Sequence, residues 1–184
     1  MLDVFDMVSF LIFVWWIVLF IRFFVANPYT VVGASMSPTF VENDFIVVDK
    51  ITPRFGQLTR WNVIVFVPPG KTIPYIKRIV WLPGETVKLV NNWVMICSGT
   101  PQNCFTLNES GYLDASIKTE ARCGVDTFTV GTWGYFVMGD NRWFSTDSRC
   151  CFGLDCYPWS SYVVPYNNII GKVYVRFYPN FSAF

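Results

Sequence analysis

Histidine is missing from all 184 residues of the chain. Its absence excludes Ser-His-Asp and Cys-His catalytic mechanisms, and with them every metal site that uses a histidine ligand. Any proton transfer must therefore be carried out by lysine, aspartate, glutamate, tyrosine or cysteine. Charged residues are also scarce, at 15% against about 25% in an average globular domain. The net charge of only +1 shows no excess of basic residues, so we expect no nucleic acid among the partners.

Apolar residues are in excess, with 53% of the chain hydrophobic and 19% aromatic. An apolar run from Met7 to Ala26 contains a single charge, Arg22, and has about the 20 residues that span a bilayer. A cleaved signal peptide would have a basic leader and a small-residue cleavage site, whereas this leader is acidic. We therefore assign residues 1–27 to a short N-terminus and a retained transmembrane helix, which Pro28 ends.

The remaining residues, 28–184, form short apolar segments separated by turn residues, without a long helical period. This pattern predicts a mostly β domain that is large enough for one hydrophobic core. The polar segment 98–125 is predicted to be a small inserted lobe, and 150–163 an extra loop rich in cysteine and aromatic residues. The expected strands are 29–32, 44–49, 61–67, 74–82, 86–90, 93–96, 127–130, 135–138 and 169–177.

All six cysteines lie beyond residue 96, and six cysteines allow about 15 pairings. Cys97 and Cys104 flank a turn-like loop suited to a local bridge, and Cys151 and Cys156 enclose another short loop. Free thiols are one alternative, and a four-cysteine zinc site is disfavoured because no C-x-x-C pair occurs. The even count favours an oxidising compartment. The other two cysteines are Cys123 and Cys150.

Two fragments have the residues of a nucleophile and a base. Ser35 lies in Gly-Ala-Ser-Met-Ser-Pro-Thr, a turn that can present its hydroxyl and its backbone N–H on one surface, although it can also be an ordinary turn serine. In strand 74–82, alternation places Lys77 on one face with Tyr75, Ile79 and Trp81. Apolar neighbours would lower the pKa of Lys77 and make its neutral amine a general base. The alternative is a lysine that extends into water.

A third fragment, Gly139–Arg149, packs turn formers, opposite charges and hydroxyls into a short loop, and a solvated surface loop is its alternative. The three fragments, in this order, resemble the type I signal peptidases, which are membrane-bound Ser-Lys proteases of the S26 type. The resemblance is carried by Ser-Met-x-Pro-Thr at Ser35, Tyr-x-Lys-Arg at Tyr75 with Leu-Pro-Gly after it, and Gly-Asp-Asn-Arg-x-x-Ser-x-Asp-Ser-Arg at Gly139. It covers about residues 7–175.

The resemblance implies a β-barrel or coiled β-sheet like that of signal peptidases, with a small inserted lobe, after one transmembrane helix. It implies a serine endopeptidase that removes N-terminal signal peptides from exported preproteins at the outer membrane surface. Two alternatives stay open. One is a specialised S26-like peptidase that matures a conjugation or pilus protein, and the other is an inactive anchored β-domain that acts as a binding module.

The resemblance also implies residue roles, and no cofactor or metal. Ser35 would be the nucleophile, Lys77 the general base and Ser145 the hydroxyl that orients the amine. The Ser35 N–H would be one oxyanion donor, whereas Gly33 lacks the hydroxyl that some members have as a second donor. Expected ion pairs are Arg78 with Asp140 and Asp147 with Arg149. Expected substrate contacts, in pockets for Ala-sized side chains, are Val31, Met36, Phe40, Tyr75 and Ile76.

We expect the partners to be preproteins and the lipid bilayer, and the protein to be a monomer. Arg22 at the far end of the apolar run weakly favours an outside N-terminus. The resemblance implies the opposite, a single-pass protein of the cell membrane with its catalytic domain on the extracytoplasmic side. We follow the resemblance, because the cysteines agree with it. The aromatic residues Tyr157, Trp159 and Tyr162 are predicted to contact the membrane interface.

Overall fold

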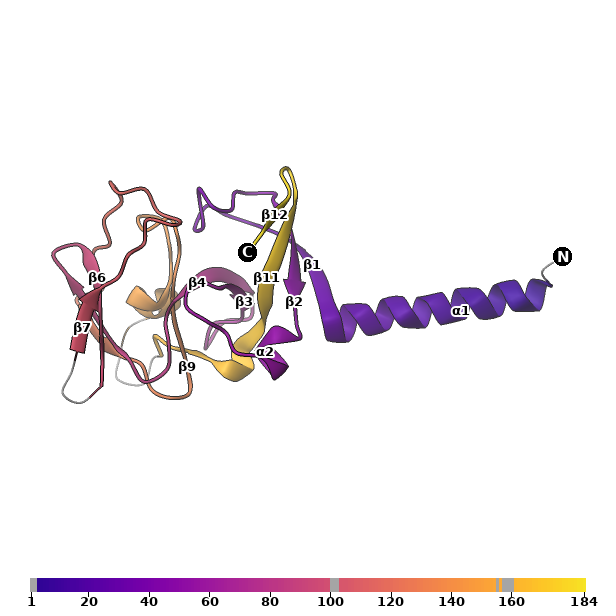
Figure 1. Cartoon of the computed structure of the whole chain (residues 1–184), viewed down its shortest axis with the longest axis horizontal. Helices are drawn as coiled ribbons and strands as arrows, with labels where there is room; N and C mark the ends of the chain where they lie inside the picture. The colour runs from indigo at the N-terminus through magenta and orange to yellow at the C-terminus, as the bar shows by residue number, and fades with distance from the viewer. Residues whose placement is uncertain (1–2, 100–102, 155, 157–160) are drawn as a thin grey trace.

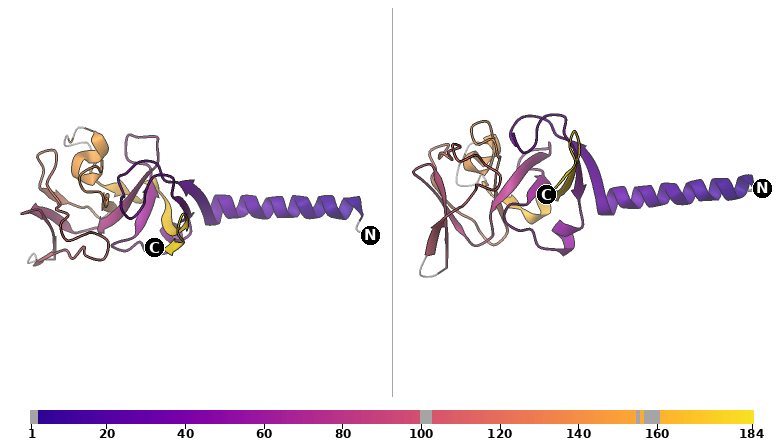
Figure 2. Two further views of the ribbon diagram at one scale, coloured as in Figure 1. Left: turned by 90° about the horizontal axis from the view of Figure 1, so that it is seen from above. Right: turned by 45° about the horizontal axis from the view of Figure 1, so that its top comes forward.

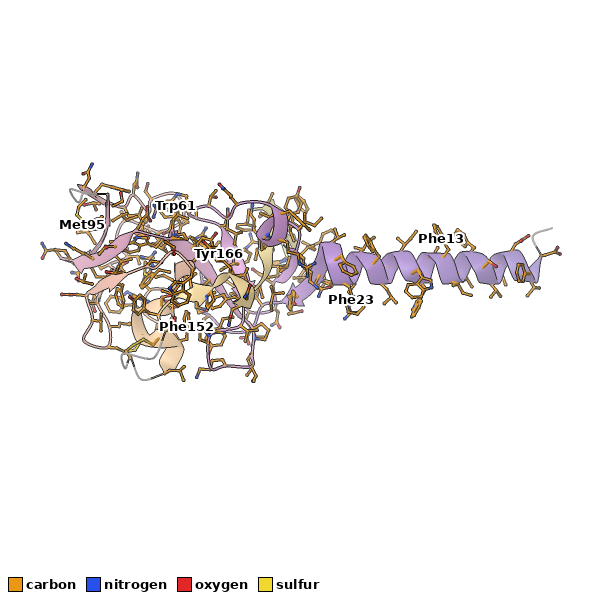
Figure 3. All side chains as sticks on the ribbon, turned by 90° about the horizontal axis from the view of Figure 1, so that it is seen from below. Phe13, Phe23, Trp61, Met95, Phe152 and Tyr166 are labelled. Atoms are coloured by element: carbon orange, nitrogen blue, oxygen red, sulfur yellow. A yellow bond between two sulfur atoms is a disulfide. The ribbon has the colours of Figure 1, made fainter. Side chains whose placement is uncertain are left out.

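A long apolar helix projects from a β domain in the computed structural model, which describes residues 3–99, 103–154, 156 and 161–184 (Figure 1). The helix comprises α1 (Val4–Phe20) and the π-helical η1 (Ile21–Val25). Its 22 residues would extend about 33 Å at 1.5 Å per residue, enough for a hydrocarbon core of about 30 Å. None of the helix is buried, and its side chains, including Phe13 and Phe23, project outward (Figure 3). The helix is thus long and apolar enough to be a membrane anchor, as predicted.

The principal sheet is antiparallel and has the strand order β1-β2-β11-β3-β4-β9-β10, with β12 paired to β11. A second antiparallel sheet has the order β7-β6-β5-β8 and lies at the end of the domain far from the helix (Figures 1 and 2). The strands of the first sheet are β1 (Ala26–Thr30), β2 (Phe45–Asp49), β3 (Val63–Phe66), β4 (Tyr75–Trp81), β9 (Gly134–Met138), β10 (Val164–Pro165), β11 (Ile169–Tyr178) and β12 (Ser182–Ala183). Those of the second are β5 (Thr86–Val90), β6 (Trp93–Ser98), β7 (Asn103–Thr106) and β8 (Thr127–Thr129).

These sheets confirm the mostly β prediction. The sequence did not predict the short elements β7, β10, β12, α2 (Thr52–Phe55), η2 (Ser148–Gly153) and η3 (Tyr166–Asn168). The second sheet also begins at Thr86, before the segment 98–125 that the sequence marks as a lobe. Buried and less buried residues alternate in β5 and β6 as they do in β2 of the first sheet, so this alternation does not show which sheet the two strands join.

The junction between helix and domain is short. Helix η1 ends at Val25 and β1 begins at Ala26, and β1 pairs along its whole length with β2. The Lys50 amine, at the end of β2, donates to the carbonyls of Arg22 and Phe23 at 3.0 and 3.4 Å. These carbonyls belong to the last turn of the helix, where intrahelical partners run out. The helix is thereby joined to the principal sheet by backbone pairing and by one side chain.

Three clusters of buried side chains form the core. One fills the space between the two sheets and includes Val80, Trp81 and Phe136. A second lies under β1 and β2 and includes Met36 and Phe40, and a third surrounds β3 and β9. Gly171 in β11 packs so closely on β2 that an added Cβ would overlap Val48 and the Asp49 carbonyl. The close approach of β11 to β2 therefore requires a residue without a side chain at position 171.

Strand β4 departs from the predicted alternation. Its pairing with β9 shifts register between Ile79 and Trp81. Val80 and Trp81 consequently pack in the same cluster, and Trp81 meets the Phe136 ring edge-on at 5.5 Å. The prediction that Trp81 shares the face of Lys77 was wrong, because a bulge re-aims every side chain that follows it.

All six cysteines are paired, as Cys97–Cys104, Cys123–Cys150 and Cys151–Cys156. The first pair links directly opposed positions of β6 and β7. Tyr162 lies against Phe128 and Phe136, and its hydroxyl donates to the Thr129 carbonyl at 2.7 Å, so this partly buried ring packs against the core cluster between the sheets. Its contact with the membrane interface stays a prediction. Tyr157 and Trp159 lie outside the described residues.

Candidate active site

Ser35 lies in the loop between β1 and β2, where the chain turns from the surface into the core. Just after β1, Val31 is still hydrogen-bonded to the residue before β2, since its N–H donates to the Asp44 carbonyl at 2.9 Å. Residues 32–34 are exposed, and Ser37 N–H closes a turn on the Ala34 carbonyl at 3.2 Å. Met36 follows with no exposed surface. Gly33 has a φ of +87°, and an added Cβ would meet nothing within 4 Å, so backbone conformation rather than crowding favours glycine there.

Lys77 is held in β4 opposite Ile64 of β3. On its other edge β4 pairs with β9 only from Arg78 onward, which leaves the Lys77 end beside the Ser35 loop. The Lys77 Nζ lies 2.7 Å from the Ser35 Oγ and 2.8 Å from the Ile76 carbonyl oxygen. The amine also lies 5.4 Å from the centre of the Tyr75 ring. Residues 42 positions apart thus form one hydrogen-bonded pair.

The Lys77 side chain is buried, with only 3% of the residue exposed. Burial lowers the pKa of Lys77 from 10.5 to about 8, because the charged amine loses its hydration. The carboxylates of Asp147 and Asp140 oppose this shift and raise the pKa in part. A substantial fraction of the amine is therefore neutral near pH 8 and can accept a proton.

The loop Gly139–Arg149, which we call the box, fixes the backbone of Ser35. Asn141 donates from its N–H to the Ser35 carbonyl at 3.1 Å and from its amide to the Ala34 carbonyl at 3.0 Å. At Gly139 an added Cβ would overlap the Ser35 carbonyl and the Ser145 side chain. The box and the Ser35 loop are therefore in direct backbone contact. The sequence marked the box but did not identify Asn141, because its partners lie more than 100 residues away.

Two buried ion pairs hold the box in shape, and the structure brings both expected pairs together. Arg78 donates to both oxygens of Asp140, at 2.8 and 2.6 Å. Arg149 donates to both oxygens of Asp147, each at 2.9 Å, and Asp147 also accepts from the Gly139 N–H at 3.1 Å. Burial acts to raise the pKa of Asp147, but the Arg149 guanidinium outweighs it and holds that pKa below its usual range. Both carboxylates have no exposed surface.

Ser145 does not make the expected hydrogen bond. Its buried hydroxyl has no hydrogen-bond partner of good geometry in the part of the chain that the structure describes, although it lies close enough to the Asp147 carboxylate to help lower the pKa of that group. The Lys77 amine donates to the Ile76 carbonyl instead. The Ser145 hydroxyl and the Ser35 carbonyl both lie against Gly139, where an added Cβ would overlap each of them.

A cavity of about 560 Å³ opens beside Ser35 and Lys77. Three of the five predicted substrate contacts, Val31, Tyr75 and Ile76, line it. Met36 and Phe40 do not, because both are fully buried in the cluster under β1 and β2. Gly33, the position that lacks a hydroxyl donor, and Val32 also line the cavity. The lining residues that the sequence did not predict are Tyr29, Thr30, Ala34, Ile46, Val65, Ile73, Pro74, Phe144 and Thr146.

Comparison with known proteins assigns the chain to a family. Residues 4–178 match the family described as signal peptidase, peptidase S26. The chain belongs to this family. Signal peptidase I P of Bacillus subtilis subsp. natto is 35% identical over 144 residues, which cover 74% of this chain and 73% of the relative. Signal peptidase IB of Staphylococcus aureus (strain Mu50) is 32% identical over 169 residues, covering 88% and 82%.

Among solved structures, a signal peptidase I from Enterococcus faecalis V583 aligns with a TM-score of 0.42 and 27% identity, over 63% of this chain and 96% of that one. Family membership covers both the apolar helix and the β domain, since the matched range begins at residue 4. The Ser35 loop, β4 and the box all lie within it.

In this member of the signal peptidase family, the buried amine should cost stability. We expect Lys77→Met to raise the free energy of unfolding at pH 7 by up to about 3 kcal/mol, since a pKa lowered from 10.5 to about 8 corresponds to a penalty of that size. The penalty is complete below pH 8 and disappears as the pH rises toward 10.5, so the advantage of the variant should shrink over that range. Unfolding in urea at pH 7 and pH 10 measures it.

The matched control is Lys118→Met, because Lys118 is exposed and should change little at either pH. A Lys77→Met variant that is less stable than the wild type at pH 7, or whose difference from it does not depend on pH, would contradict the assigned burial cost.

Proposed function

We propose that this protein is a membrane-anchored serine endopeptidase that removes N-terminal signal peptides from exported preproteins, with Ser35 as nucleophile and Lys77 as general base. The observation that carries the proposal is the 2.7 Å contact between the Lys77 Nζ and the Ser35 Oγ, in a place where burial lowers the pKa of the amine to about 8. Membership of the signal peptidase family and relatives named signal peptidase I support the same reaction.

In the proposed mechanism the neutral Lys77 amine takes the proton of the Ser35 hydroxyl as Oγ attacks the scissile carbonyl. The Ser35 N–H donates to the oxyanion of the tetrahedral intermediate. Collapse breaks the C–N bond, and the Lys77 ammonium returns its proton to the departing amine, which becomes the mature N-terminus. Water, deprotonated by the same amine, then hydrolyses the acyl-enzyme and releases the signal peptide as a carboxylic acid.

The neighbouring residues position these two groups. Asn141 and the Arg78–Asp140 and Asp147–Arg149 pairs keep the Ser35 loop against the box. Gly33 provides no hydroxyl, so we assign one oxyanion donor, the Ser35 N–H. Orientation of the amine by Ser145 stays a prediction, and the Ile76 carbonyl is the acceptor that we assign to this role in the resting enzyme.

We propose that substrate binds extended in the cavity beside Ser35, between the loop after β1 and the start of β4. Val31, Tyr75 and Ile76 line this space and are our candidates for shallow apolar contacts that admit small side chains. An extended peptide there can pair with exposed backbone, as in β-strand addition. Met36 and Phe40 support the loop from below.

We further propose that the protein is a single-pass membrane protein, with its β domain on the extracytoplasmic side. Three disulfides fit an oxidising compartment. Ser35 follows the helix end at Val25 by a short segment, so its backbone lies at most roughly 36 Å beyond the helix, even along a fully extended chain. A cleavage site that emerges directly from the bilayer fits that reach.

Catalysis by the pair predicts that Ser35→Ala and Lys77→Ala each lower cleavage of a preprotein by about 10⁴-fold, because neither residue activates a peptide bond alone. Ser110→Ala and Lys118→Ala are matched controls at exposed positions of the segment 98–125 and should cleave normally. Processing is followed by gel-based release of the mature protein. If both site variants cleave at the wild-type rate, the anchored binding module becomes the better interpretation.

The pKa of Lys77 also predicts the pH profile. The amine must be neutral to act as base, so kcat/KM should rise about tenfold per pH unit below pH 8 and level off above it. The measurement uses a peptide substrate without groups that titrate between pH 6 and 9. A profile that is flat over this range, or that falls above pH 7, would be incompatible with a neutral lysine base.

Orientation is tested by protease protection. In inverted membrane vesicles the β domain should resist an added protease, because it lies in the lumen, and detergent should make it digestible. Digestion of intact inverted vesicles would place the domain on the cytoplasmic side and overturn the topology without affecting the assigned chemistry.

A further inference from the structure

Residues Thr119–Cys123, which we call the strap, lie along the box from its middle to its end. The Arg142 guanidinium donates to the Thr119 hydroxyl, and Arg149 reaches the Glu120 carbonyl at 3.5 Å. Cys123 is bonded to Cys150, the residue directly after the box. Besides Arg122, three residues of the strap (Thr119, Glu120 and Cys123) are therefore attached to the box or to Cys150 directly after it.

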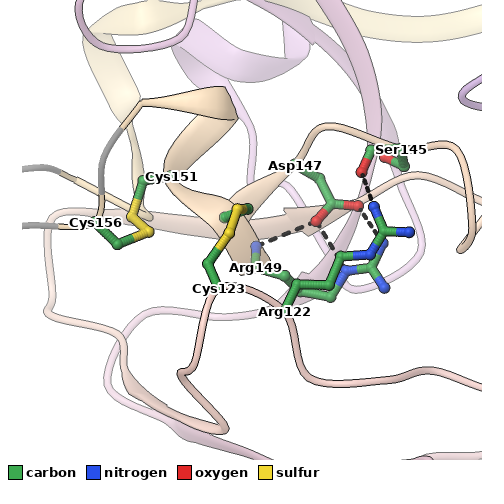
Figure 4. The surroundings of a disulfide bond; sticks show 8 residues. Arg122, Cys123, Ser145, Asp147, Arg149, Cys151 and Cys156 are labelled. Carbon is green, nitrogen blue, oxygen red and sulfur yellow. Dashed lines mark hydrogen bonds and ion pairs between the residues drawn. A yellow bond between two sulfur atoms is a disulfide. The ribbon is translucent and has the colours of Figure 1, made fainter.

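Arg122 makes the central attachment. One guanidinium nitrogen donates to the Ser145 carbonyl at 3.2 Å, and the other donates to the Trp143 carbonyl (Figure 4 shows the first contact). These two carbonyls stand on either side of Phe144. The planar fork of an arginine can hold two acceptors at once, which a lysine cannot do with the same geometry. Arg122 thus bridges the backbone on both sides of a single residue.

The disulfide fixes the base of this side chain. Residues 122–125 form a tight turn in which Val125 N–H donates to the Arg122 carbonyl at 3.2 Å. Cys123 and Gly124 occupy its two central positions with φ of +55° and +73°, values typical of a type I′ turn. The Cys123–Cys150 bond joins this turn to the end of the box, as Figure 4 shows. The disulfide therefore links the residue next to Arg122 with a residue close in sequence to Ser145, whose carbonyl Arg122 contacts.

Phe144 is the residue that this arrangement holds. Its side chain is 80% exposed, yet it lines the cavity beside Ser35 and Lys77. Its N–H donates to Asn141 Oδ1 at 3.3 Å, and Asn141 in turn holds the backbone of the Ser35 loop. A phenylalanine exposed at the edge of a cleft gains from burial under a bound peptide, provided that its backbone stays in place.

We propose that Arg122, anchored by the Cys123–Cys150 disulfide, is a positioning residue that holds Phe144 as a wall of the substrate cleft. Phe144 contacts the extended peptide where it crosses Ser35, and Arg122 acts on substrate only through Phe144. The inference rests on the proposed peptidase function, and it adds a specificity element that lies outside the Ser35–Lys77 pair. It assigns no proton transfer to Arg122.

A double-mutant cycle on the full-length protein tests the proposal. We expect Phe144→Ala to raise KM for a signal-peptide substrate about tenfold, and Arg122→Gln to raise it by a similar factor. Because Arg122 acts through Phe144, the double variant should show the KM of Phe144→Ala alone rather than the product of both effects. The turnover number and the pH midpoint of activity should stay those of the wild type, since Ser35 and Lys77 are untouched.

Matched controls are Arg54→Gln and Phe55→Ala, an exposed arginine and an exposed phenylalanine in α2 that should leave KM unchanged. Arg122→Lys keeps the charge but loses the fork, so it should show a partial rise in KM. Joint replacement of Cys123 and Cys150 by Ser should raise KM in the same direction while Arg122 remains.

Several results would overturn the proposal. An unchanged KM in Phe144→Ala would show that Phe144 does not contact the substrate. Independent, multiplicative effects on KM in the double variant would show that Arg122 does not act through Phe144. A fall in turnover with a shifted pH midpoint in Arg122→Gln would assign Arg122 to the chemistry instead. Unchanged KM without the disulfide would contradict the anchoring. Failure of the proposed function is separate, because then the wild type itself would not cleave.

Discussion

The site depends on a lysine amine that is kept away from water within 2.7 Å of a serine hydroxyl. Desolvation outweighs the two nearby carboxylates and lowers the pKa of Lys77 to about 8. A fully hydrated lysine would stay charged at neutral pH and could not accept the serine proton. The apolar walls around β3 and β4 thus contribute to chemistry as well as to packing, since they exclude the water that would restore the charge.

The other charges near this amine occur as closed pairs. Asp140 and Asp147 each accept two hydrogen bonds from one guanidinium, Arg78 and Arg149. Buried pairs of this geometry contribute little net stability, but the loss of one partner leaves an uncompensated buried charge. Their role here is to fix a loop of many polar atoms against the Ser35 backbone. The ion pairs thereby hold the box near its two ends, while the hydrogen bonds of Arg122 hold the backbone around Phe144.

The apolar helix and the nucleophile follow one another in a short stretch of the chain. Helix η1 continues into β1 without a linker, and β1 leads into the Ser35 loop. Lys50 binds the last carbonyls of the helix from the adjacent strand β2. The orientation of the sheet relative to the helix is therefore restrained, so the cleft keeps a defined relation to the end of the apolar segment.

Local sequence patterns were enough for the helix, for most long strands and for the Ser35, Lys77 and box fragments, because periodicity and motif spacing are properties of neighbouring residues. They did not predict the bulge that turns Trp81 away from the face of Lys77, the burial of Met36 and Phe40, or that the Lys77 amine donates to the Ile76 carbonyl rather than bonding Ser145. They also left the Cys123–Cys150 pairing open. Each of these depends on which distant segments pack together, and only the tertiary structure decides that, because side-chain direction after a bulge or in a turn follows from non-local contacts.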